Sequence, residues 1–100
     1  MNEEPHETSL PGEELVRQGL ADLAKGEITE SALLVLVASP RLRRLGINVP
    51  DANVTRPYED RLYELLGKRL GNAAHSHYNS LIRRIVSYAR ALERELSQKS

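Results

Sequence analysis

Two residues that could together handle a phosphate group lie close to each other in the second half of the chain. Arg69 and His75 are separated by five residues, and Gly71 stands between them. A guanidinium can hold a phosphate through two parallel hydrogen bonds, and an imidazole can transfer a proton near neutral pH. Because glycine lets the chain turn, the two side chains can face each other and form a metal-independent ribonuclease pair.

The position of this pair, just before the last predicted helix, resembles the arginine–spacer–histidine motif of the HEPN superfamily. The resemblance implies an all-helical and often dimeric protein with ribonuclease activity of the toxin or defence type. Arg69 and His75 would then carry the motif across a dimer interface. The chain departs from the family pattern in two places, since Leu70 follows the arginine directly and Tyr78 comes three residues after the histidine.

Ordinary helix-end chemistry is the alternative interpretation of the same residues, and we favour it. Arg69 would interact with the negative C-terminal end of one helix, while Asn72 and His75 would interact with the N-terminal end of the next. On this interpretation the chain has no catalytic residue, and we lean toward a protein that is not an enzyme.

The histidines do not form a metal-binding pattern. His75 and His77 are two positions apart, and residues at that spacing do not face each other on a helix. No carboxylate stands at motif spacing from them, and the sequence contains no cysteine. We therefore expect no metal and no other cofactor.

A group of arginines offers a different kind of site, a basic patch. Arg41, Arg43 and Arg44 follow each other closely, and three more arginines lie in the last predicted helix, at positions 83, 84 and 90. The short helix around Pro40 is too short to project several side chains into a nucleic-acid groove. We favour solvated arginines, so that a nucleic-acid-binding regulator is the weakest of three hypotheses and a nucleic-acid partner is allowed but not favoured.

The composition describes an ordinary small globular protein. Of the 100 residues, 40% are hydrophobic and 28% charged, and 14 basic side chains balance 14 acidic ones. A formal net charge of zero argues against an electrostatic grip on nucleic acid by the whole domain. The acidic N-terminus does not look like a signal peptide, and no segment reaches the roughly 20 apolar residues that span a bilayer. We expect a cytoplasmic protein without a membrane partner.

The chain is organised around the stretch from Ala32 to Ala38, which has no polar side chain. A helix that is apolar on every side must be enclosed by its neighbours, and no partner strand is evident for the rival interpretation as a buried strand. Thr29 is the expected cap of this helix, and Pro40 is expected to end it. Apolar spacing and end signals predict further helices over residues 10–25, 40–45, 57–70 and from 72 into the nineties, with a loop over 47–55.

These elements predict an all-α fold, a small antiparallel helical bundle of about four main helices plus one short helix. We expect residues 1–8 to be a disordered tail and residues 9–97 to be a single helical domain. The sequence contains no Phe and no Trp, so the core has few large apolar side chains. Val86 with Ile82 would extend an apolar surface for a second subunit. The leading hypothesis is therefore a small, non-enzymatic protein-interaction or regulatory module that self-associates as a homodimer, with a protein partner also allowed.

Overall fold

A computed structural model describes residues 10–98, and this part of the chain is entirely helical with connecting turns and loops. The main helices are α1 (Glu13–Ala24), α2 (Glu30–Val37), α4 (Tyr58–Leu70) and α5 (Ala74–Gln98). The short α3 (Ser39–Arg44) follows α2, and a 3-10 turn, η2 (Gly71–Ala73), joins α4 to α5. The prediction of an all-α fold with four main helices and one short helix is confirmed.

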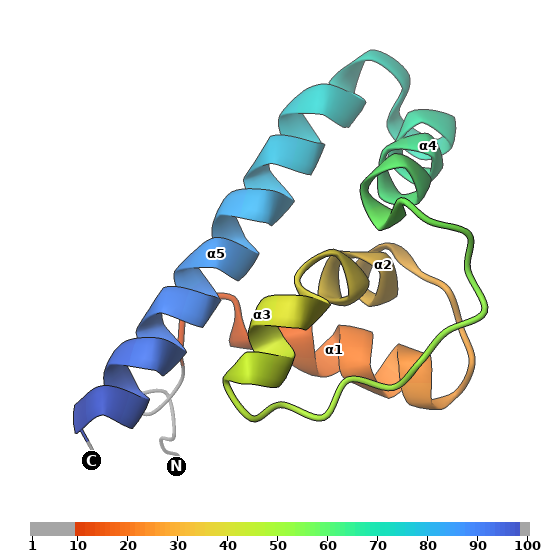
Figure 1. The fold of residues 1–100 in the computed structure, drawn as a ribbon. Coiled ribbons are helices and arrows are strands. Elements are labelled where there is room, and N and C mark those ends of the chain that lie inside the picture. The colour runs from red at the N-terminus through yellow and green to blue at the C-terminus, as the bar shows by residue number, and fades with distance from the viewer. Residues whose placement is uncertain (1–9, 99–100) are drawn as a thin grey trace, which may run out of the picture.

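Helix α2 lies at the centre, with the other helices around it, and α5 runs along one edge of the molecule (Figure 1). Thr29 caps α2 as predicted, because its side chain accepts a hydrogen bond from the backbone N–H of Ala32 at 3.1 Å. The residues from Ala32 to Leu36 are all buried. The predicted enclosed helix is therefore confirmed. It ends at Val37, earlier than the predicted end at Pro40, and Pro40 lies in the first turn of α3.

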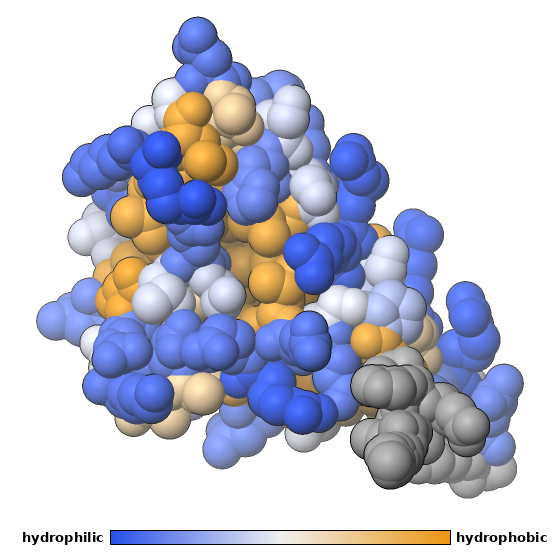
Figure 2. All heavy atoms as spheres, turned by 180° about the vertical axis from the view of Figure 1, so that it is seen from behind, coloured by the Kyte–Doolittle hydropathy of each residue, from blue (hydrophilic) through white to orange (hydrophobic). Residues whose placement is uncertain are grey.

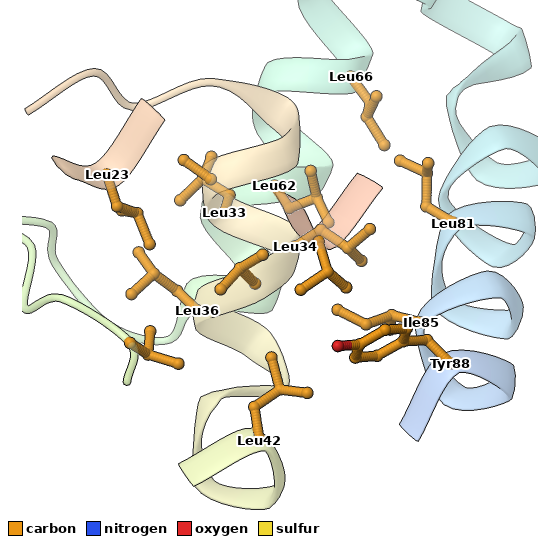
Figure 3. Packing of buried hydrophobic residues seen from close by; sticks show 14 of the residues in the cluster. Leu23, Leu33, Leu34, Leu36, Leu42, Leu62, Leu66, Leu81, Ile85 and Tyr88 are labelled. Carbon is orange, nitrogen blue, oxygen red and sulfur yellow. The ribbon is translucent and has the colours of Figure 1, made fainter. Parts of the chain in front are cut away.

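The core is a cluster of mainly aliphatic side chains from α1, α2, α3, α4 and α5. Leu34 is fully buried and lies between Leu62 of α4 and the pair Ile85 and Tyr88 of α5 (Figure 3). Leu42 brings α3 into the same cluster. These contacts hold α4 and α5 in fixed positions relative to α2.

The contact between α1 and α2 is unusually close because Gly19 has no side chain. A Cβ atom built at Gly19 would lie 2.4 Å from the carbonyl oxygen of Ser31 and 2.5 Å from a methyl carbon of Val35. Such distances are far below normal packing separations. Gly19 thus allows the backbones of the two helices to approach each other.

The start of α1 differs from the prediction. The helix predicted over residues 10–25 begins only at Glu13, and the expected tail at residues 1–8 lies outside the described residues. Gly12 is the residue before α1, and it has a positive φ of 75°, which glycine adopts without steric cost. A Cβ atom there would lie 2.6 Å from the carbonyl oxygen of Arg84, so Gly12 also brings this end of α1 against α5.

Residues 47–57 form the one long connection between helices in the described part of the chain, and they include the predicted loop at 47–55. Val49 of this loop is buried, and Ile47 packs against the core. The surface of the molecule retains an apolar band bordered by hydrophilic residues on the face opposite to that of Figure 1 (Figure 2). None of the helices within residues 10–98 is both long and apolar enough to cross a bilayer.

Candidate functional site

Arg69, in the last turn of α4, is held by an ion pair with Glu30 in the first turn of α2. Its Nη2 donates to Oε1 of Glu30 at 2.9 Å, and its Nε donates to the other carboxylate oxygen. The hydrogen bonds that Arg69 donates to Glu30 raise the pKa of Arg69 further, so the guanidinium remains charged. The two-pronged geometry is the one that the sequence analysis expected for a phosphate, but here a carboxylate of the same chain occupies it.

His75, in the first turn of α5, has neighbours at both ring nitrogens. Its Nε2 lies 3.3 Å from the side-chain nitrogen of Asn79, and its Nδ1 lies 3.5 Å from the hydroxyl of Tyr63. Both ring nitrogens of His75 therefore have a polar neighbour, one on α5 and one on α4.

The structure therefore gives Arg69 and His75 different partners. They stand on either side of η2, and none of the hydrogen bonds or ion pairs found within residues 10–98 joins them. A phosphate that used the same edge of the Arg69 guanidinium would have to displace Glu30. The ribonuclease hypothesis remains a prediction, as does the interpretation of both residues as helix-end groups.

Two tyrosines extend this region along α4 and α5. The rings of Tyr63 and Tyr78 lie with centroids 5.4 Å apart and are tilted by 59°, an arrangement that aromatic pairs favour. Burial raises the pKa of Tyr78, and the negative charges of Glu59 and Asp60 raise it further. Tyr78 therefore keeps its proton and is a hydrogen-bond donor rather than a base.

The arginines of the predicted basic patch are partly engaged with acceptors. Arg41 forms an ion pair of 3.4 Å with Glu93 of α5. Arg43 donates to the backbone carbonyl of Val49 at 2.9 Å and forms an ion pair of 3.4 Å with Asp51. Arg44 is exposed. The patch is thus divided among different contacts, and two of its three charges are balanced locally.

A pocket of about 440 Å³ lies between the end of α2, α3 and the 47–57 loop. Two arginines and two carboxylates contribute to its wall, so its charges balance and do not favour an anionic or a cationic ligand. The guanidinium carbon of Arg56 lies 5.5 Å from the ring centre of Tyr58. The lining consists of Leu36, Val37, Ser39, Pro40, Arg43, Asp51, Ala52, Arg56, Pro57, Tyr58 and Glu59.

Asp22 is a buried carboxylate of α1 that belongs to none of the patterns identified in the sequence. The hydroxyl of Thr29 donates to it at 2.5 Å, and the side-chain amide of Gln18 donates to its other oxygen at 2.8 Å. These two hydrogen bonds lower the pKa of Asp22. Because Thr29 also caps α2, these hydrogen bonds fix α1 against the start of α2. They give the burial of the Asp22 carboxylate a structural role.

Within the described residues, no three His, Cys, Asp or Glu side chains are grouped so that they could hold a metal ion. Comparisons of the chain with protein-family models, with curated proteins and with solved structures found no match. The contacts and charges of this chain are therefore the basis for any proposal about its function.

Proposed function

We propose that the protein is a helical interaction module that acts as a homodimer through one face of α4 and α5. This α4–α5 face consists of Tyr63, Tyr78, Ile82 and Val86. Tyr63 is 42% exposed, and the other three are half-buried. The observation that carries the proposal is this continuous row of large apolar side chains, which remains accessible along two helices.

The spacing of the residues makes the row continuous. Tyr78, Ile82 and Val86 follow each other at intervals of four, so their side chains are neighbours on the surface of α5. Tyr63 joins the row through its ring contact with Tyr78. Tyr78 and Ile82 also pack against the core, whereas Val86 is not among the side chains that do so. Val86 is thus the member of the row whose burial would depend most on a partner.

A second copy of the chain is the partner that suits this row. In a two-fold symmetric contact, the same surface serves both subunits. If the two α5 helices run antiparallel, Ile82 of one subunit can lie against Val86 of the partner subunit, and the reverse contact follows by symmetry. A standard interface buries about 800 Å² on each partner, and the four side chains of the α4–α5 face supply less area than this. We therefore expect a weak dimer, which forms at micromolar protein concentration.

The test is sedimentation equilibrium of Val86→Asp beside the wild-type protein. Fully burying one valine stabilises by about 1.5 kcal/mol, so the half-buried Val86 contributes about 0.8 kcal/mol in each of the two symmetric copies. Placing a carboxylate in the same contact adds a desolvation cost of about 1.5 kcal/mol or more. Together these terms should cost about 3 kcal/mol and raise the dimer dissociation constant somewhat more than a hundredfold.

Ser87→Asp is the matched control, because Ser87 is the next residue of α5, is exposed and acquires the same charge outside the α4–α5 face. It should dimerise like the wild type. A wild-type protein that stays monomeric at several hundred micromolar would contradict the proposal, and so would equal weakening by both variants.

A further inference from the structure

The outward face of α5 carries a row of arginines without acidic partners. Arg83, Arg84, Arg90 and Arg94 are exposed, and no ion pair or hydrogen bond joins their side chains to another residue between 10 and 98. Positions 83, 87, 90 and 94 follow one helical face. We call Arg83, Arg84, Ser87, Arg90 and Arg94 the arginine row.

Acidic side chains of α5 do not interrupt this row, and Glu14 of α1, which lines a neighbouring hollow with Arg84, forms no ion pair with it among residues 10–98. On a helix, the neighbours that can pair are three and four residues away, and for Arg83 and Arg84 these positions hold no carboxylate. Glu93 is within reach of Arg90 by spacing, but it pairs with Arg41. The chain has no net charge, so the row concentrates positive charge on one side of a neutral molecule.

A hollow of about 440 Å³ lies at the start of the row, where the turn before α1 meets α5. Its polar side chains are two guanidinium groups and two hydroxyls, and it contains no carboxylate. Gly12 shapes it by bringing the turn against the carbonyl of Arg84. The hollow is lined by Pro11, Gly12, Ser80, Arg83, Arg84 and Ser87.

We propose that the arginine row and this hollow bind the phosphate backbone of a nucleic-acid duplex. Arginine and serine side chains are typical phosphate donors at protein–DNA contacts, and guanidinium groups hold phosphate oxygens in pairs. The row from Arg83 to Arg94 extends for about 16 Å along the helix. It can therefore contact several phosphates in succession without reading bases.

Other anionic partners fit this face less well. A helix that lies on a membrane inserts an apolar face into the lipid, but the arginine row itself contains no apolar side chain. Leu81, Ile85 and Tyr88 of α5 are buried, and its accessible apolar side chains belong to the α4–α5 face. Single-stranded nucleic acid is usually held by aromatic side chains on which bases stack, and the row contains none. These features favour a duplex.

The test measures binding of the full-length protein to a fluorescent 20-base-pair DNA duplex by anisotropy as the salt concentration is varied. Four phosphate contacts predict a slope of log affinity against log salt of about −3.6, or a loss of about 150-fold between 50 and 200 mM salt. Arg83→Gln with Arg84→Gln should reduce the slope to about −1.8 and weaken binding about 60-fold at 100 mM salt.

Lys25→Gln with Lys68→Gln is the control, since it removes the same charge from exposed positions outside α5, one just after α1 and one in α4. This variant should bind like the wild type. Equal weakening by both double variants, or no duplex binding by the wild type at 50 mM salt, overturns the proposal. Tighter binding to single-stranded RNA, or to vesicles of anionic lipid, than to the duplex also overturns it. Melting curves of all variants should coincide, because the substituted side chains are exposed.

Discussion

Replacing Gly19 with alanine inserts one methyl group where α1 and α2 touch. The new carbon would lie 2.4 Å from the carbonyl oxygen of Ser31, so the helix backbones must move apart. Overpacking of this kind costs about 3 kcal/mol at the upper end of its range. Alanine regains about 1 kcal/mol because it favours the helix more than glycine does. We expect a net loss of about 2 kcal/mol in the free energy of unfolding.

Gly67 offers the matched control, because it is a helical glycine of α4 with no atom near the position of a new Cβ. Gly67→Ala should stabilise the protein by up to about 1 kcal/mol through helix propensity alone. For a domain of this size, thermal unfolding should shift down by about 10 °C for Gly19→Ala and up by about 5 °C for Gly67→Ala. Circular dichroism melting measures both shifts. Equal shifts of the same sign would refute the close contact at Gly19.

Two further substitutions test the core and the buried carboxylate. Leu34→Ala should cost about 3 kcal/mol in urea unfolding, because it leaves a cavity among fully buried side chains, whereas Leu45→Ala at a half-buried position should cost about 1 kcal/mol or less. Asp22 has a lowered pKa in the folded protein. Its ionised form therefore stabilises the fold at pH values above the pKa of the unfolded chain, about 4. This contribution is lost as the pH falls through the pKa of the folded protein. Asp22→Asn should therefore lose less stability than the wild type between pH 6 and pH 3 in urea titrations, and an unchanged pH dependence would contradict the role given to the Thr29 and Gln18 hydrogen bonds.

Much of the fold could be predicted because its signals are local. The cap at Thr29 and the apolar stretch that follows it depend on neighbouring residues, and both define α2 as it is found. The helix predicted over residues 57–70 begins one residue later, at Tyr58 with Pro57 just before it, and it ends at Leu70 as predicted, with Gly71 following. The start of α5 was placed only two residues early, since η2 occupies residues 71–73 before the regular helix begins at Ala74.

The candidate site was harder to predict because its contacts join residues far apart in the sequence. Glu30 and Arg69 are 39 positions apart, and only the packing of α2 against α4 brings them together. The sequence placed Arg69 and His75 near the same turn but could not give the direction of either side chain. The buried Asp22 likewise depends on how α1 lies against the start of α2.

The central position of α2 has a consequence for how the molecule comes apart. A helix of eight residues is too short to persist in water without tertiary contacts, and α1, α3, α4 and α5 all pack against it. Removing any one of the larger helices would expose leucine and valine side chains that have no polar side to turn outward. Unfolding should therefore be all-or-none for the centre of the protein, with local opening confined to the ends of α5 and the 47–57 loop.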